Sequence, residues 1–67
     1  MNLTINGEAR EFEAPSLSLP ELLELLGLSG KPVVVELDQN PVLPGDHPTS
    51  QITDGSSLEI VTIAAGG

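Results

Sequence analysis

Residues 1–28 read MNLTINGEAREFEAPSLSLPELLELLGL and hold a β-hairpin pattern followed by a helix pattern. In residues 1–6, apolar and polar side chains alternate, which is the period of a half-buried strand. Asn6-Gly7 then predicts a two-residue hairpin turn, because both positions of that turn take positive φ. We expect a second, antiparallel strand over residues 8–13. Its charged side chains are typical of a sheet edge.

A helix is predicted to begin after Ser18. Ser18 can cap it, Pro20 lies in the first turn, and Glu21 completes a capping box. The leucines that follow have helical spacing and form one apolar stripe made of Leu19, Leu22, Leu23 and Leu26. Gly27 is predicted to end the helix, with Leu28 folding back onto it.

The second half of the chain contains three further strand patterns. Residues 33–37 are β-branched, and residues 42–43 form a short edge segment between two prolines. Residues 44–57 are predicted to be a long loop with a helical turn near 49–52. Residues 58–63 are apolar on both faces for much of their length, which is typical of a central strand.

This order of elements predicts the fold. A hairpin, a helix and further strands give one mixed sheet, with the first and last strands as a parallel central pair joined by a right-handed crossover. The predicted class is α+β, a β-grasp (ubiquitin-like) fold whose mixed four- to five-stranded sheet has one helix packed on one face. We assign residues 1–63 to this domain and residues 64–67 to a flexible C-terminal tail.

Composition excludes several classes of function. The chain has 67 residues, a net charge of −8 and no cysteine, and its single His47 cannot build a metal site alone. A nucleic-acid binder needs a basic surface, and anionic lipids would repel this chain. No apolar run spans a bilayer and no signal peptide is evident. We expect a cytoplasmic protein that is a monomer when free.

The sequence ends in Ala64-Ala65-Gly66-Gly67, directly after the last strand pattern. Four extended residues reach about 13–14 Å, enough for the α-carboxylate of Gly67 to enter a narrow pocket of another protein. At neutral pH this carboxylate is an anionic oxygen nucleophile. Chain ends are also commonly small and disordered, so the tail alone leaves both interpretations open.

The residues resemble the small sulfur carrier proteins of the ubiquitin-like superfamily, most closely the ThiS carriers of thiamine biosynthesis. The matching segments are INGE at 5–8, LLELLGL at 22–28, VVEL at 34–37, DG at 54–55, LEIV at 58–61 and the terminal GG at 66–67. Two turns depart from the family pattern. Residues 38–41 replace a frequent Asn-Gly, and Gly55-Ser56 stands where Gly-Asp is usual.

The resemblance implies a chemistry at Gly67. An ATP-dependent adenylating enzyme would activate the carboxylate, and a sulfur donor of cysteine desulfurase or rhodanese type would convert it to a thiocarboxylate. Thiazole synthase would then receive the sulfur. Gly66, Ala65 and Ala64 would serve as a thin stalk. The chain would bind no cofactor, because the partner consumes the ATP, and it would be a protein co-substrate rather than an enzyme.

A docking surface is also expected, because one helix covers only one face of the sheet. The other face is predicted to carry exposed aliphatic side chains that partners contact reversibly. The residues predicted for it are Val61, Ile63, Val35 and Leu43.

Other functions fit the same pattern. The small subunit of molybdopterin synthase also ends in diglycine on this fold but is usually longer, and a carrier for another sulfur-containing product is a further alternative. A ubiquitin-like modifier would form an isopeptide bond through its tail, and a plain interaction module would use the tail for nothing.

Overall fold

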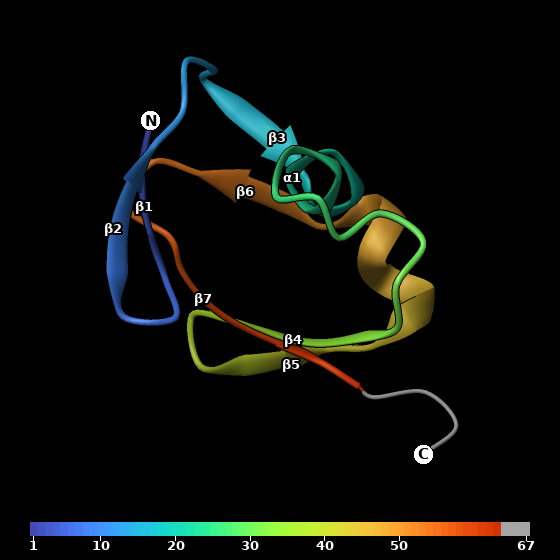
Figure 1. Ribbon diagram of the computed structural model, residues 1–67. Coiled ribbons are helices and arrows are strands. Elements are labelled where there is room, and N and C mark those ends of the chain that lie inside the picture. Colours follow the sequence, from blue (N-terminus) through green and yellow to red (C-terminus); the bar gives the residue numbers. More distant parts are fainter. Residues whose placement is uncertain (64–67) are drawn as a thin grey trace.

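The computed structural model describes residues 1–63 (Figure 1). The predictions for Ala64 to Gly67 therefore lie outside the described residues. The elements in chain order are β1 (Asn2–Ile5), β2 (Glu8–Glu11), β3 (Ser16–Ser18), α1 (Leu19–Leu25), β4 (Val33–Leu37), β5 (Asn40–Val42), the 3-10 helix η1 (Pro44–Thr49), β6 (Gln51–Thr53) and β7 (Ser57–Thr62).

Five of the strands form one mixed sheet in the order β2-β1-β7-β4-β5. β7 lies in the middle, parallel to β1 and antiparallel to β4. The other two neighbours, β1–β2 and β4–β5, are antiparallel hairpins. In Figure 1 the helix lies across one side of this sheet. The predicted β-grasp arrangement and its parallel central pair are confirmed.

The first hairpin follows from its turn residues. Asn6 and Gly7 have φ values of 52° and 82°, as a two-residue turn that matches strand twist requires. β2 is an edge strand, and all four of its residues are exposed. It ends at Glu11, two residues before the predicted end at residue 13.

Both ends of α1 are capped as predicted. The Ser18 hydroxyl accepts from the Glu21 N–H, and the Glu21 carboxylate accepts from the Ser18 N–H at 2.9 Å. At the other end, the Leu28 N–H donates to the Leu23 carbonyl at 2.8 Å, and Gly27 takes a φ of 76°. This hydrogen bond and the positive φ of Gly27 are features of a Schellman motif, which satisfies the last carbonyls of a helix.

A second, two-stranded sheet was missed by the sequence analysis. β3 pairs with β6 antiparallel, and Leu17 lies opposite Ile52. The helical turn of the long loop is η1, so the turn predicted near residues 49–52 is placed too late. The reason is that Pro44 starts the helical segment, whereas Ile52 belongs to a strand and is fully buried.

The strands β5 and β7 of the main sheet also differ from the prediction. β5 is the predicted edge segment, but it covers Asn40–Val42 rather than 42–43. β7 is central, yet only one of its faces is buried. The buried side chains on that face are Leu58 and Ile60. The outward positions of the strand are Ser57, Glu59 and Val61, so the prediction of a strand that is apolar on both faces is wrong.

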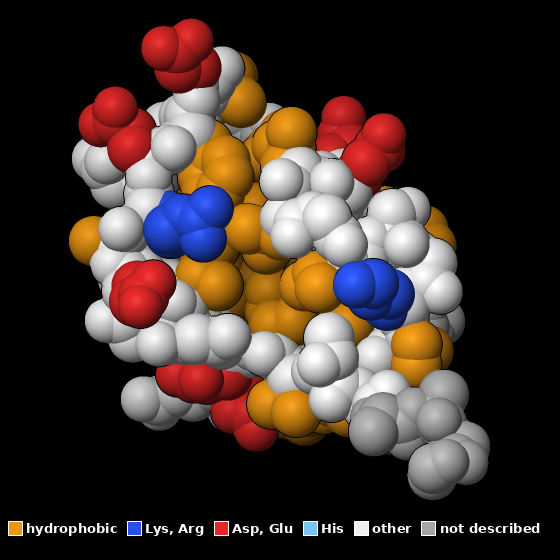
Figure 2. Space-filling view, in the orientation of Figure 1, with side chains coloured by type: hydrophobic (Ala, Val, Ile, Leu, Met, Phe, Trp, Pro, Cys, Tyr) orange, Lys and Arg blue, Asp and Glu red, His pale blue; other side chains and the backbone are white. Residues whose placement is uncertain are grey.

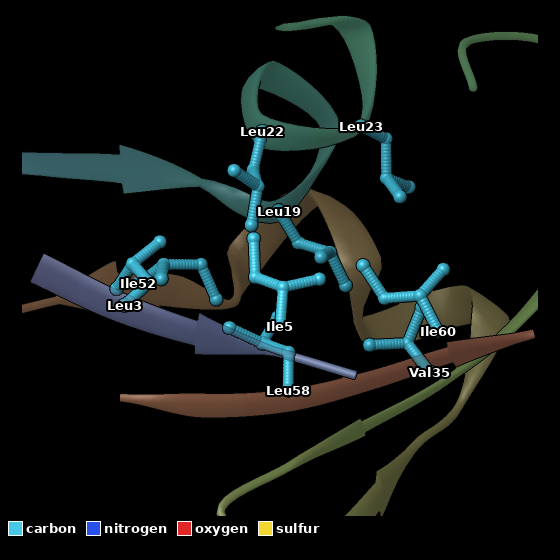
Figure 3. Packing of buried hydrophobic residues seen from close by; sticks show 9 residues of the cluster. All are labelled: Leu3, Ile5, Leu19, Leu22, Leu23, Val35, Ile52, Leu58 and Ile60. Atoms are coloured by element: carbon cyan, nitrogen blue, oxygen red, sulfur yellow. The ribbon is translucent and has the colours of Figure 1, made fainter. Parts of the chain in front are cut away.

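The core lies between the main sheet and the layer made by α1, β3 and β6 (Figure 3). It is aliphatic throughout, and its buried members are Leu3, Ile5, Leu19, Leu22, Leu23, Val35, Ile52, Leu58 and Ile60. Burial of such side chains is the main favourable contribution to folding in a chain without disulfides. In residues 1–63, no helix is long and apolar enough to cross a bilayer.

Candidate functional site

The end of β7 fixes where the C-terminal segment leaves the body. Thr62 pairs with Val33, and the Ile63 N–H donates to the Pro32 carbonyl at 2.9 Å. The central strand is thus held by hydrogen bonds up to the last described residue. The predictions for Ala64, Ala65, Gly66 and Gly67 start from this anchored point and stay predictions.

Ile63 lines an apolar groove beside the end of β7. Its side chain is 51% exposed, and the groove continues over Pro32, Val33 and Leu28. Lys31 and His47 also line the groove. Ile63 was predicted to lie on the sheet face away from the helix. It is exposed, but the groove that it lines also includes Pro20 and Leu23 of α1.

A band of hydrophobic side chains crosses the face seen in Figure 2, with one basic side chain on each side. The chain has two basic residues, Arg10 and Lys31, and Lys31 lines the groove beside Ile63. The Arg10 guanidinium carbon lies 5.9 Å from the centre of the Phe12 ring, within the range of a cation–π contact. Each basic side chain thus lies beside apolar groups, Arg10 at the Phe12 ring and Lys31 at the groove.

The only histidine has a local structural role. Nε2 of His47 lies 3.3 Å from the Val42 carbonyl oxygen, across the junction between β5 and η1. Within residues 1–63, no three His, Cys, Asp or Glu side chains are grouped so that they could hold a metal ion.

The open face of the sheet, opposite α1, carries three exposed aliphatic residues on neighbouring strands. Val34 and Val61 are directly paired and are 51% and 60% exposed. Continuing the β4–β5 register by one residue places Leu43, 65% exposed, beside Val34. We call Leu43, Val34 and Val61 the aliphatic row. Exposed apolar groups that adjoin one another are typical of contact surfaces.

The prediction was wrong for Val35, which is fully buried. Val35 is paired with Ile60, and both side chains face the core. Since side chains alternate along a strand, the neighbouring Val34 faces outward in its place. Val34 was missed because three consecutive valines have no period that could show which of them is exposed. Val61 and Leu43 are exposed as expected.

The aliphatic row lies beside two carboxylates. Glu36 on β4 and Glu59 on β7 are direct cross-strand partners, and both are exposed. They lie two residues along from Val34 and Val61, on the same face. The structure therefore brings together an apolar strip and an acidic pair that the sequence analysis did not connect.

Comparison with known proteins gives consistent matches over nearly the whole chain. The model of the ThiS family matches residues 3–67. The sulfur carrier protein ThiS of Thermus thermophilus is 35% identical over 63 residues, which cover 94% of this chain and 95% of that protein.

Two solved structures are similar in both fold and sequence. The crystal structure of a thiamine biosynthesis protein (ThiS) from Geobacter metallireducens has a TM-score of 0.86 at 32% identity, and the match covers 100% of both chains. An NMR structure of a thiamine biosynthesis protein from the same organism has a TM-score of 0.83 at 32% identity. That match covers 100% of this chain and 88% of the other.

Proposed function

The chain belongs to the ThiS family, and from that premise we propose that it is a sulfur carrier in thiamine biosynthesis with Gly67 as its sulfur-bearing residue. The observation that carries this proposal is the extent of the match, which continues through the diglycine at residues 66 and 67. The fold match over 100% of a ThiS structure supports it independently.

We propose that the reaction at Gly67 has two steps. An adenylating enzyme joins the α-carboxylate to the α-phosphate of ATP, and pyrophosphate leaves. A sulfide equivalent from a sulfur donor then attacks the acyl carbon, and AMP leaves with one of the carboxylate oxygens. The product is a C-terminal thiocarboxylate. When thiazole synthase takes the sulfur, the C–S bond breaks and water supplies the oxygen that regenerates the carboxylate.

The residue types at the terminus support this chemistry. A side chain on residue 67 would crowd the approach of the carboxylate to a phosphate, and glycine has none. Gly66 has access to backbone conformations that other residues adopt only at a cost. The hydrogen bond from Ile63 to Pro32 anchors the start of the stalk.

We further propose that the catalytic groups belong to the partner enzymes. The sequence contains no cysteine nucleophile, and the Nε2 atom of its one histidine lies against a backbone carbonyl oxygen. The carrier would dock through the aliphatic row, with the terminus reaching into the partner's active site. Because activation consumes ATP, we place the reaction in the cytoplasm.

The test is incubation of the full chain with the adenylating enzyme of its own organism, ATP and a sulfur source, followed by intact-mass analysis. The expected product is heavier than the carrier by the difference between one sulfur and one oxygen atom. Gly67→Val, or one extra residue after Gly67, should abolish this product while the circular dichroism spectrum stays that of the wild type.

Two other results would contradict the proposal. Full conversion of the Gly67→Val variant would show that the terminal glycine is not required. Attachment of the chain to lysines of other proteins, with no thiocarboxylate, would identify a protein modifier instead.

A further inference from the structure

The groove beside Ile63 has a preformed wall. The Leu28 N–H donates to the Leu23 carbonyl at 2.8 Å, which fixes Leu28 at the end of α1. The Lys31 N–H in turn donates to the Leu28 carbonyl at 3.1 Å. Between them Gly30 takes a φ of 78°, a left-handed conformation that glycine adopts without steric cost. All of these residues line the groove, so its wall is in place before anything binds.

The groove differs in charge from the rest of the chain. Ten residues of the chain are acidic, yet none of the described residues that line the groove is. Two of the lining residues, Lys31 and His47, can carry a positive charge. Lys31 is exposed and is one of only two basic residues. Most of the other lining side chains are apolar, so the groove suits an anion that is attached to small apolar groups.

The C-terminal segment starts at this groove. Ile63 lines it, and the Ile63 N–H is bonded to the carbonyl of Pro32, the residue next to Lys31. Four extended residues beyond Ile63 reach about 13–14 Å. The groove has a volume of about 480 Å³, and ligand sites commonly have volumes of about 300–1,000 Å³.

The tether favours this segment over other anions. Residues 64–67 are two alanines and two glycines, and under the proposed function they end in a negative charge. A short tether gives the terminus an effective concentration at the groove of about millimolar. A second copy of the chain, at the same net charge of −8, is repelled instead. The chain's own terminus is therefore the anion that this groove meets first.

Sulfur improves the match between the terminus and the groove. Much of the charge of a thiocarboxylate lies on sulfur, which is larger and more polarisable than oxygen. An ion of this kind loses less hydration free energy when it moves from water to apolar side chains. The groove should therefore bind the terminus more tightly when Gly67 carries sulfur than when it ends in a carboxylate.

We propose that the groove holds residues 64–67 when Gly67 carries sulfur, with the thiocarboxylate beside Lys31. This inference rests on the proposed function, because it requires the sulfur on Gly67. The groove shelters the acyl carbon from water. Attack by water there would break the C–S bond, release hydrogen sulfide and restore the carboxylate. The segment leaves the groove when an enzyme takes the terminus, since the same residues cannot occupy both sites.

The test measures how fast the loaded carrier loses its sulfur. The thiocarboxylate of the full chain is prepared chemically, by cleavage of an intein fusion with ammonium sulfide, so no partner enzyme is needed. Intact mass follows hydrolysis over time. The wild type should hydrolyse more slowly than a five-residue thiocarboxylate peptide with the sequence of residues 63–67. Lys31→Gln should hydrolyse about twofold to fivefold faster than the wild type, because one ion pair is lost.

Arg10→Gln is the matched control. It removes the other basic residue and changes the net charge equally, but Arg10 lies on β2 and does not line the groove. Its thiocarboxylate should hydrolyse at the wild-type rate. Nuclear Overhauser contacts between Gly67 and the methyl groups of Leu28 or Ile63 should appear in the loaded wild type. They should weaken in Lys31→Gln and should not depend on protein concentration.

Equal hydrolysis rates in the wild type and Lys31→Gln would overturn the inference, as would equal acceleration in Arg10→Gln. Absence of the contacts to Gly67 would overturn it too. Contacts that appear only as the protein concentration rises would place the terminus of a second copy in the groove, which also contradicts it. A failure of the proposed function is a separate result, because the wild-type chain would then form no thiocarboxylate with the adenylating enzyme, ATP and a sulfur source.

Discussion

Asn6 contributes more to the structure than its turn motif indicates. Its backbone takes a φ of 52°, and its side-chain amide reaches β7. There Nδ2 donates to the Ile60 carbonyl at 3.1 Å, while Oδ1 accepts from the Ile60 N–H at 2.7 Å. β1 ends at Ile5, so this amide continues the parallel pairing by one step. The turn is a local signal in the sequence, whereas the bridge to a residue 54 positions away is not.

Substitution of Asn6 should separate these two contributions. Asn6→Gly keeps the positive φ but loses two hydrogen bonds, so we expect a loss of about 1–3 kcal/mol in the free energy of unfolding. Asn6→Ala loses the same bonds and adds about 1 kcal/mol of left-handed backbone strain. Urea denaturation measures both variants. A glycine variant as stable as the wild type would mean that the bridge contributes nothing.

The valines of β4 show where sequence patterns lose information. Val33, Val34 and Val35 have the same side chain, so nothing local distinguishes the buried one from the exposed one. Their orientation is set by the register with β7, in which Val35 is paired with the buried Ile60. That pairing is a tertiary contact, and the prediction of Val35 as a surface residue failed for this reason.

Alanine substitutions should show which of two valines is buried and which is exposed. Val35→Ala empties part of a fully buried position and should cost about 2 kcal/mol in unfolding free energy. Val34→Ala should cost less than about 1 kcal/mol, because its side chain is half exposed. In the adenylation assay only Val34→Ala should raise the KM for the carrier. Equal stability losses in the two variants would contradict the assignment.

At the scale of elements, the predictable parts are those encoded by neighbouring residues. The capping box and Gly27 delimit α1, and Asn6-Gly7 defines the first hairpin. β3 and β6 have three residues each, too few for a period to be recognised, and they are stabilised by pairing with each other. The buried Ile52 therefore lies in a segment that reads as a loop. The candidate docking face was predicted in part. The acidic pair on it could be identified only from the register between β4 and β7.

The capping box of α1 makes the helix sensitive to acid. The pKa of Glu21 is lowered from its ordinary value of 4.5, first because the carboxylate accepts the backbone N–H of Ser18 and then because of the Ser18 hydroxyl. A carboxyl whose pKa is lower in the folded state stabilises fully above its unfolded value. That contribution is lost as the pH falls through the folded value.

We therefore expect Glu21→Gln to flatten the acid limb of the stability curve. Glutamine can serve in a capping box but does not titrate, so its contribution should not change between neutral pH and pH values below 4.5. Melting temperatures measured across that range give the comparison. Parallel curves for the wild type and the variant would show that Glu21 has no part in the acid sensitivity.

At the scale of the whole molecule, charge is distributed unevenly. The chain has ten acidic residues and only two basic ones, and the face seen in Figure 2 shows one basic side chain on each side of a hydrophobic band. The open face keeps an acidic pair beside exposed aliphatic residues. Such a distribution costs stability through self-repulsion in the compact state. It also favours encounter with a basic surface.

The cost of the net charge should be visible in the response of stability to salt. At about 0.01 M ionic strength the Debye length is about 30 Å, which exceeds the 21 Å shortest dimension of the molecule, so most of its carboxylates repel one another. At about 1 M the Debye length is about 3 Å and that repulsion is screened. The unfolded chain spreads the same charges over a larger volume and gains less from screening.

We therefore expect the melting temperature at neutral pH to rise by about 5 °C between these two concentrations of sodium chloride, measured by calorimetry. Near pH 4.1, where the net charge is close to zero, the same addition of salt should have little effect. A melting temperature that falls with salt at neutral pH would show that favourable ion pairs outweigh the net repulsion.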